Sequence, residues 1–246
     1  MSVPVVPGDV DILILCGGAG TRLRPVVSDR PKSMAAIAGR PFLDMLIGHV
    51  SGYGFRRFIL CTGHMKDTIS AYYSQRYRDL EIVFSEEEKP LGTAGAVREA
   101  EPHIRSSSFI VMNGDSFCPL HMREFLAFHH EHGADISIVL SRVKDAEDYG
   151  IVECDSAGVV VSFLERGQRR EGLVNAGVYA MQKKILTAIP AGTFFSLEHD
   201  LFPSYVSRRF YGYVTDKPFI DIGTPERYAA ACTMFAETEK GRITDG

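Results

Sequence analysis

The chain has 246 residues, enough for one large α/β domain with a substantial buried core or for two small domains. Hydrophobic residues make up 45% of the chain and charged residues 24%, which is typical of a globular protein and excludes a low-complexity chain. The formal net charge of −4 argues against a nucleic-acid-binding surface, which would need clustered lysine and arginine.

The five cysteines are widely spaced and include no C-x-x-C pair, which indicates reduced thiols in a cytosolic protein. The N-terminal residues lack the basic-then-apolar order of a signal peptide. No segment approaches the roughly 20 apolar residues that are needed to span a bilayer. We therefore expect a cytoplasmic protein with no membrane partner.

A short apolar run at residues 12–15 predicts the first buried strand, and a glycine-rich, basic loop follows it. Glycines can bring backbone N–H groups against an anion, and basic side chains add charge there. The spacing fits neither a dinucleotide fingerprint, which would need glycine in place of Leu23, nor a P-loop. A tight turn with incidental surface charge is the alternative interpretation. The residues concerned are Gly17, Gly18, Gly20, Arg22, Arg24 and Lys32.

Strand and helix patterns then alternate up to residue 140. This alternation predicts right-handed parallel crossovers and a sheet that is covered on both faces. Ligands bind beyond the carboxyl ends of the strands in such sheets, which is where the glycine loop falls. We expect helices at residues 42–50, 67–77, 93–103 and 122–132, and strands at residues 58–61, 81–84, 109–112 and 134–140.

After residue 149 the pattern changes to shorter strand segments, which would add antiparallel or mixed strands to the same sheet. We therefore expect an α/β fold in one domain spanning residues 1–246. The expected strands are 151–153, 159–163, 173–181, 210–214 and 219–220, and the expected helices are 183–188 and 225–239.

Two aspartates stand out in strand-end segments. Asp115 directly follows a predicted strand, so it faces the same edge of the sheet as the glycine loop; both a structural turn and a metal ligand fit it. Asp221 precedes Thr224, which we expect to cap the last helix with Pro225 in its first position. The cluster at residues 129–132 contains three histidines, and we expect it to stabilise a helix end rather than to bind metal.

Residues 17–23, followed by Arg30, Pro31 and Lys32, resemble the signature of the sugar-1-phosphate nucleotidylyltransferases. These enzymes join a nucleoside triphosphate to a sugar 1-phosphate and release pyrophosphate. The resemblance extends over residues 12–228 and implies a Rossmann-like three-layer α/β/α core, similar to the glycosyltransferase-A fold, with a mixed, mainly parallel sheet. It also implies a nucleotide-binding half at 10–140 and a sugar-phosphate-binding half at 141–240. Family members often carry a β-helix after this core, and we expect none here.

The resemblance implies roles for individual residues. Arg22, Lys32 and Asp115 would be catalytic, and Asp115 and Asp221 would bind Mg²⁺, which favours carboxylate oxygens. Arg166 stands where the family usually has lysine and keeps the positive charge. The nucleotide would contact Leu15, Gly17, Gly18, Gly20, Thr21, Arg22, Gly92, Thr93 and Ala94. The sugar phosphate would contact Tyr149, Gly150, Glu165, Arg166 and Asn175.

Residues 91–95 are similar to the base-reading loop of guanylyltransferases, although a helix N-cap at Thr93 would give the same pattern. The chain looks most like the bacterial D-glycero-α-D-manno-heptose 1-phosphate guanylyltransferases, which supply GDP-heptose for capsule or surface polysaccharide. Mannose 1-phosphate guanylyltransferase is the near alternative, since the two sugars differ by one hydroxymethylene.

Two interpretations from other classes stay open. A catalytically silent nucleotide-sugar sensor would be expected to lose Arg22, Lys32 or one of the two aspartates, and all four are present. A dinucleotide-dependent oxidoreductase is compatible with the fold class but not with the fingerprint. A homo-oligomer is compatible with the resemblance, since relatives form dimers and tetramers.

Overall fold

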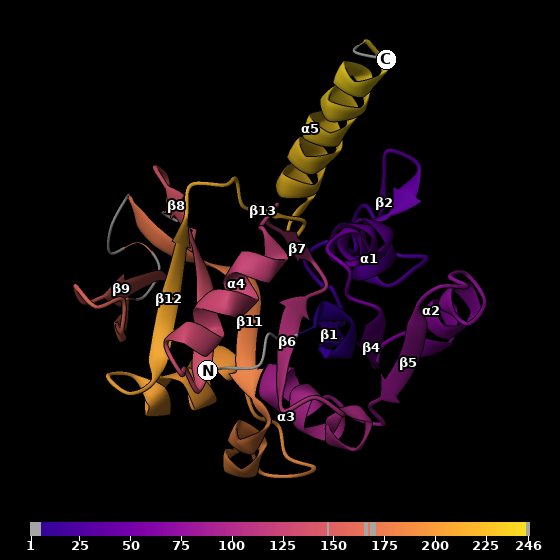
Figure 1. The fold of residues 1–246 in the computed structure, drawn as a ribbon. Coiled ribbons are helices and arrows are strands. Elements are labelled where there is room, and N and C mark those ends of the chain that lie inside the picture. Colours follow the sequence, from indigo (N-terminus) through magenta and orange to yellow (C-terminus); the bar gives the residue numbers. More distant parts are fainter. Residues whose placement is uncertain (1–5, 147, 165–166, 168–170, 245–246) are drawn as a thin grey trace.

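A nine-stranded mixed sheet runs through the molecule (Figure 1). The computed structural model describes residues 6–146, 148–164, 167 and 171–244. The strands of the sheet are β1 (Asp11–Leu15), β4 (Arg57–Thr62), β5 (Glu81–Glu86), β6 (Ser108–Asn113), β8 (Ile136–Val143), β9 (Ile151–Cys154), β10 (Val160–Leu164), β11 (Gly172–Gln182) and β12 (Phe210–Thr215). Two short ribbons pair β2 (Ala36–Ile37) with β3 (Arg40–Pro41) and β7 (Ser116–Phe117) with β13 (Ile220–Asp221).

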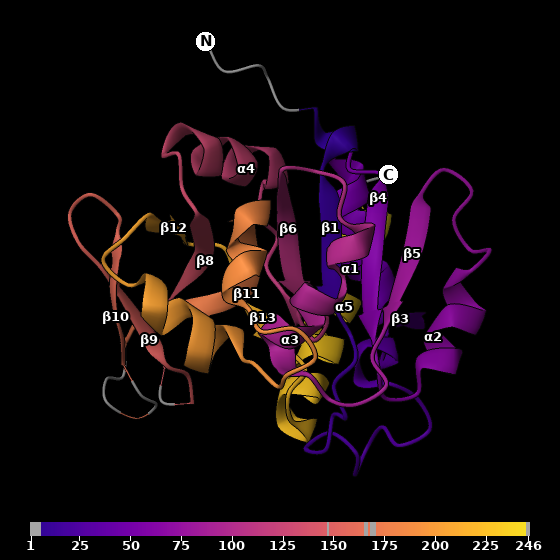
Figure 2. The same cartoon turned by 90° about the horizontal axis from the view of Figure 1, so that it is seen from below.

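The first half of the sheet is parallel. Strands β5, β4, β1 and β6 lie side by side in that order, and all three pairings between them are parallel. Strand β11 then joins antiparallel to β6, and β9 and β10 continue the sheet to its far edge, as Figure 2 shows. The prediction of a mixed, mainly parallel sheet is confirmed.

Strand β8 lies farther from β6 than the alternating pattern suggested. Its neighbours are β11, in an antiparallel pairing, and β12, in a parallel one. Strand β11 therefore separates the fifth expected strand from the parallel block. The local strand pattern could not reveal this, because pairing joins segments that are far apart in the sequence.

Helices cover both faces of the sheet. On β1, Ile12 and Ile14 face one core cluster and Leu13 faces the other, because neighbouring strand residues point to opposite faces. Burial on both faces explains why the parallel strands read as continuous apolar runs. The helices are α1 (Phe42–Gly52), α2 (Lys66–Tyr73), α3 (Gly92–Glu99), α4 (Met122–Glu131) and α5 (Pro225–Thr244).

Several helix ends differ from the predictions. The helix expected over 93–103 is α3 followed by a 3-10 turn at Glu101–His103, because Pro102 cannot continue an α-helix. Helix α2 ends at Tyr73, and the Tyr77 hydroxyl beyond it donates a hydrogen bond to the buried Asp44 carboxylate on α1. Short helical turns at Leu197–Leu201 and Phe202–Tyr205 were not predicted.

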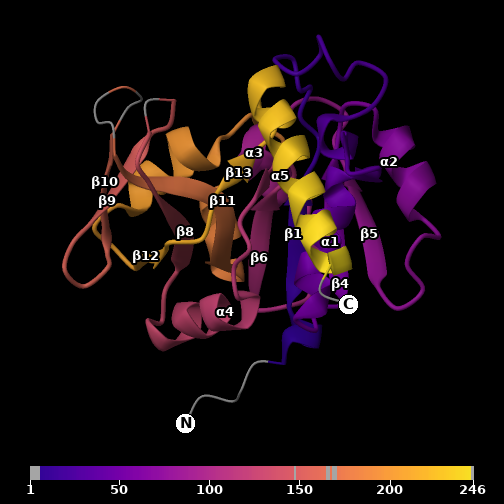
Figure 3. The same ribbon diagram turned by 90° about the horizontal axis from the view of Figure 1, so that it is seen from above.

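The loop that follows β1 lies at the carboxyl end of the parallel strands. Figure 3 shows this loop at one end of the sheet and the turn at Pro7–Asp9, which precedes β1, at the other. Helix α5 begins near that same end and extends away from the sheet (Figure 1). None of the described helices is long and apolar enough to cross a membrane.

Candidate active site

Two adjoining cavities open at the carboxyl end of the parallel strands, with volumes of about 240 and about 600 Å³. Both are lined by Leu15, Gly18 and Asp115, so the loop after β1 and the turn after β6 form the boundary between them. The smaller cavity is the more polar one, and its basic side chains are Arg22 and Lys32. This arrangement suits an extended ligand with an anionic end in the smaller cavity.

Lys32 and Asp115 form an ion pair in the smaller cavity, with 2.5 Å between Lys32 Nζ and Asp115 Oδ2. The lysine side chain is 13% exposed and the aspartate 41% exposed, so the carboxylate faces open space while the ammonium is enclosed. Gly20 makes room for the lysine. It has a φ of +58°, and a Cβ at that position would lie 2.9 Å from Lys32 Cβ.

Arg22 supplies a second positive charge to the smaller cavity. Its side chain is exposed, and its Nη2 reaches the turn at Gly223, within 3.8 Å of where a Cβ on that glycine would lie. The cavity therefore has one enclosed cation, Lys32, and one at its mouth, Arg22. Two cations so placed can bind different phosphates of one polyphosphate.

The larger cavity lies between the glycine loop and the start of α3. Gly17, Gly18 and Ala19 line one side, and Gly92, Thr93 and Ala96 line another. Its acidic side is formed by Glu87 and Glu88, at the end of β5. A largely apolar cavity with a few polar groups on its wall is the usual form of a small-molecule site.

Glu87 is held in place at this wall. Its backbone N–H donates to Thr62 O at 2.8 Å, and its Oε2 accepts a hydrogen bond from Leu91 N at 3.1 Å. Burial raises the pKa of the Glu87 carboxyl, and the hydrogen bond from Leu91 opposes that rise. The described part of the chain supplies no hydrogen-bond donor to Oε1, so this oxygen is left for a ligand.

Most of the predicted nucleotide residues line one of the two cavities. Ala94 differs, because it is buried and its N–H donates to Phe195 O at 2.9 Å. Thr93 is not the helix N-cap, since α3 begins at Gly92; its hydroxyl accepts a hydrogen bond from Leu197 N at 2.8 Å. The predicted residues that line the cavities are Leu15, Gly17, Gly18, Gly20, Thr21, Arg22, Gly92 and Thr93.

The short ribbon of β7 and β13 brings together the backbone segments that carry the two predicted metal ligands. Asp221 pairs with Ser116, and the next residue, Ile222, donates its N–H to Asp115 O at 3.0 Å. The Asp221 side chain is only 11% exposed and accepts a hydrogen bond from Gly223 N at 2.8 Å. Its remaining partners are Tyr149 and Arg227.

The predicted sugar-phosphate residues lie on the second half of the sheet. Tyr149 contacts Asp221, and burial followed by this hydrogen bond raises the pKa of its hydroxyl. Asn175 lies within β11, where its Oδ1 accepts from Gly177 N at 2.8 Å and its Nδ2 donates to Tyr179 Oη at 2.8 Å. Both polar atoms of this side chain thus serve the strand itself.

Neither of the two cavities described above is lined by Tyr149, Gly150 or Asn175. Glu165 and Arg166 lie outside the described residues.

The histidine cluster has structural contacts. His129 is fully buried, and its ring nitrogens contact Ser137 Oγ at 2.9 Å and Gln182 Nε2 at 3.3 Å. His132 Nδ1 lies 2.9 Å from Phe128 O, one turn earlier in α4. Within the described residues, no group of three or more histidine, cysteine, aspartate or glutamate side chains could hold a metal ion.

Several residues that line the larger cavity were not among the predicted site residues, and His64, Glu87, Asn113 and Phe194 are among them. Glu87 sits in an acidic run just before the 91–95 loop, a signal that the sequence does contain. The Asn113 side chain has a buried Oδ1 without a hydrogen-bond donor in the described part of the chain. Phe194 is 66% exposed, unusual for so large an apolar side chain, and nothing in the local sequence pattern singles it out.

Comparison with known proteins gives one family match. Residues 12–238 match a family model described as nucleotidyl transferase. The chain is 36% identical over 224 residues to the D-glycero-α-D-manno-heptose 1-phosphate guanylyltransferase of Aneurinibacillus thermoaerophilus, over 90% of this chain and 96% of that protein. It is 34% identical over 224 residues to the mannose-1-phosphate guanylyltransferase of Mycobacterium tuberculosis, over 89% of this chain and 62% of that protein.

Comparison with solved structures also finds similar nucleotidyltransferases. A crystal structure of HddC from Yersinia pseudotuberculosis, described as complexed with GMP-PN, superposes with a TM-score of 0.82 and 37% identity, over 92% of this chain and 99% of that chain. A putative glucose-1-phosphate thymidylyltransferase from Bacillus anthracis superposes with a TM-score of 0.80 at 19% identity, over 92% of this chain and 94% of that chain. The second similarity concerns the fold alone.

Proposed function

The chain belongs to the nucleotidyl transferase family, and from that premise we propose that it transfers GMP from GTP to D-glycero-α-D-manno-heptose 1-phosphate, giving GDP-heptose and pyrophosphate. As an enzyme it is a sugar-1-phosphate nucleotidylyltransferase. The observation that carries the proposal is the pair of adjoining cavities, one basic and one largely apolar with a carboxylate on its wall. The triphosphate binds in the first and the base in the second.

Guanine fits the wall of the larger cavity better than adenine does. The Watson–Crick edge of guanine presents the N1–H and N2–H₂ donors, whereas adenine presents an acceptor at N1. An ionised carboxylate can only accept hydrogen bonds, so Glu87 suits the two adjacent donors of guanine; adenine offers one donor, N6–H₂, and the lone pair of its N1 repels the carboxylate. Discrimination of this kind is strong, because the wrong base leaves a desolvated polar group unpaired.

The reaction is an in-line displacement in which an oxygen of the sugar phosphate attacks the α-phosphorus and pyrophosphate leaves. Such phosphoryl chemistry depends on positioning and charge neutralisation rather than on covalent catalysis. Lys32, enclosed in the smaller cavity, stabilises the charge that builds on the α-phosphate. Arg22, at its mouth, binds the departing β- and γ-phosphates.

Mg²⁺ is the cofactor in this proposal, with Asp115 and Asp221 as its protein ligands. The donor set fits the ion, because both groups are carboxylates and Mg²⁺ is usually held by one or two carboxylates together with phosphate oxygens and water. The Asp115 carboxylate faces the smaller cavity, in keeping with this role. When bound, the ion neutralises phosphate charge and orients the two substrates.

The sugar phosphate binds on the second half of the sheet, near Tyr149, Gly150 and Asn175, with Glu165 and Arg166 as further ligands. Heptose is favoured over mannose because two relatives that are matched over 96% of their own length are heptose 1-phosphate guanylyltransferases. Mannose 1-phosphate is the second candidate, in line with the relative from M. tuberculosis. The product would serve capsule or surface polysaccharide synthesis from the cytoplasm.

Pyrophosphate release tests this function. The purified chain is incubated with Mg²⁺, each of GTP, ATP, CTP and dTTP, and either heptose or mannose 1-phosphate. We expect turnover with GTP and the heptose phosphate, and a loss of at least about 100-fold in Asp115→Asn, because a charged group at the reacting phosphates is removed. Turnover with another triphosphate would refute guanylyl transfer, and GTP binding without turnover would favour a sensor.

A further inference from the structure

The Asp221 carboxylate is engaged on both of its oxygens. Oδ1 accepts from Gly223 N at 2.8 Å, and Oδ2 accepts from the Tyr149 hydroxyl. Arg227 Nη1 lies 3.2 Å from both oxygens. A guanidinium therefore occupies the carboxylate that the proposed function assigns to a divalent cation.

Arg227 has a second carboxylate within reach. Its Nη2 lies 2.8 Å from Asp148 Oδ2, and the Asp148 side chain is 77% exposed. The guanidinium also stacks on the Tyr149 ring, 4.4 Å from its centroid. One basic side chain in the first turn of α5 thus bridges an enclosed acid and a solvent-exposed acid.

We propose that Arg227 is a positioning residue that competes with a divalent cation for Asp221, and that Asp148 receives the guanidinium when the cation takes its place. The proposal rests on the magnesium assignment of the proposed function. A guanidinium and a divalent cation on the same Asp221 oxygens disfavour each other, since two positive charges about 4 Å apart repel and the carboxylate is mostly enclosed. The guanidinium keeps a carboxylate partner and its place over the Tyr149 ring if it swings toward Asp148.

The direction of the effect separates competition from a merely structural role. If Arg227 only fixed the orientation of the Asp221 carboxylate, its removal would make that carboxylate more mobile and would weaken cation binding. If it competes, its removal strengthens binding. Removal of the Asp148 carboxylate should then weaken cation binding, because Asp221 would be the carboxylate left to pair with Arg227.

Mn²⁺ binding tests the proposal. Free Mn²⁺ is titrated by electron paramagnetic resonance against the full chain without substrates, and Asp221→Asn gives the background of binding elsewhere. We expect Arg227→Met to lower the dissociation constant by about 10-fold and Asp148→Asn to raise it by about 2- to 5-fold, as for a partly exposed ion pair. Arg227→Lys keeps the charge and should stay within about 2-fold of the wild type.

The double variant Arg227→Met, Asp148→Asn is the decisive control. If Asp148 acts by holding Arg227, its substitution has no effect in the Arg227→Met background. An equal effect in both backgrounds would mean that Asp148 attracts the cation directly and would overturn the proposal, as would weaker binding by Arg227→Met. Wild-type binding no stronger than that of Asp221→Asn would instead refute the magnesium assignment itself.

Discussion

At the scale of single residues, substrate choice depends on which polar atoms are left without a partner inside the cavities. One carboxylate oxygen of Glu87 accepts a hydrogen bond from Leu91 N, and the proposed function assigns the other oxygen to the base. Glu88, its neighbour, lines the same cavity but is exposed. The two carboxylates therefore have similar positions in the sequence and different environments.

Glu87→Gln should weaken GTP binding by about 10- to 100-fold, because the amide places a donor against the N1–H and N2–H₂ donors of guanine. ATP binding should improve, since the same amide can donate to adenine N1. Calorimetric titration of GTP and ATP in the absence of sugar phosphate measures both constants.

Glu88→Gln is the matched control, and its preference for GTP over ATP should equal that of the wild type. Tripolyphosphate binding checks that the glycine loop is intact in both variants. An unchanged ratio of GTP to ATP affinity in Glu87→Gln would remove this residue from base recognition.

Sequence motifs predicted the residues that line the smaller cavity better than those that line the larger one. Arg22, Lys32 and Asp115 lie in dense motifs, and all three line the smaller cavity. Glu87 and Phe194 reach the larger cavity from segments more than 100 residues apart in sequence. Their meeting depends on tertiary packing, which local patterns do not encode.

At the scale of elements, strand β11 connects the two halves of the sheet, and it contains a bulge. The register against β8 shifts between Asn175 and Tyr179, and the Asn175 side chain bridges the irregularity. Gly177 lies inside it with a φ of +72°, and a Cβ there would lie 2.8 Å from Asn113 Nδ2 and even closer to Ser116 Oγ. The strand can pass the turn after β6 because this residue has no side chain.

Gly177→Ala should lower the free energy of unfolding by about 3 kcal/mol or more, because left-handed strain adds to a steric clash with buried neighbours. Gly192→Ala isolates the strain, since Gly192 has a φ of +64° and open space around its Cβ position. That variant should lose only about 1 kcal/mol. Urea unfolding of both variants measures the difference, and equal losses would contradict the steric argument.

The helices and strands themselves were largely predictable, because most of them carry strong local patterns. Helix α1 and strands β4 and β6 differ from the predicted ranges by one or two residues at their ends. The order of strands in the second half was not predictable. It depends on β11 pairing with β6 on one side and β8 on the other, over separations of many residues.

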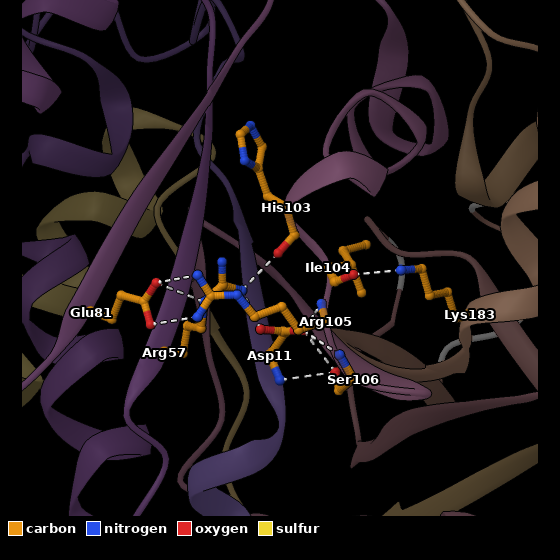
Figure 4. Close-up of polar contacts among 8 residues, drawn as sticks. All are labelled: Asp11, Arg57, Glu81, His103, Ile104, Arg105, Ser106 and Lys183. Atoms are coloured by element: carbon orange, nitrogen blue, oxygen red, sulfur yellow. Dashed lines mark hydrogen bonds and ion pairs between the residues drawn. The ribbon is translucent and has the colours of Figure 1, made fainter.

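At the scale of the whole molecule, a polar network fastens the amino ends of the parallel strands, opposite the cavities. Figure 4 shows Asp11 of β1 and Glu81 of β5 on either side of Arg57 of β4. Burial alone would raise the pKa of the Asp11 carboxyl, but hydrogen bonds from Ser106 and Arg57 outweigh it and lower the pKa. This carboxylate therefore stabilises the fold above its unfolded pKa, and the contribution is lost as the pH falls through the lower folded value.

Buried His129 should make the fold acid-sensitive at a higher pH. Burial lowers the pKa of His129 to about 4, while the unfolded chain titrates near the ordinary value of 6.5. The unfolded state then binds more protons between these values, so stability is complete above pH 6.5 and falls as the pH drops toward 4. His129 should account for a loss of roughly 2 kcal/mol between pH 7.5 and pH 5.

Urea unfolding of the wild type and of His129→Gln at these two pH values measures this contribution. Burial also lowers the pKa of His49 and His130, so the wild-type change includes them, and the difference between the two proteins isolates His129. Parallel losses in both proteins would show that His129 does not contribute.

The position of β8 between β11 and β12 has a consequence for synthesis on the ribosome. Residues 136–143 emerge before either neighbouring strand, and the second neighbour is complete only at Thr215. At 5–20 residues per second, both edges of β8 stay open for about 2 to 8 s, until β11 is complete at Gln182, and one edge stays open for about 4 to 14 s. The parallel block of β1, β4, β5 and β6 can form in that interval, and an unpaired β8 beside it is a template for association between nascent chains. Translation speed across residues 144–215 and chaperone binding to this strand therefore bear on the yield of folded protein.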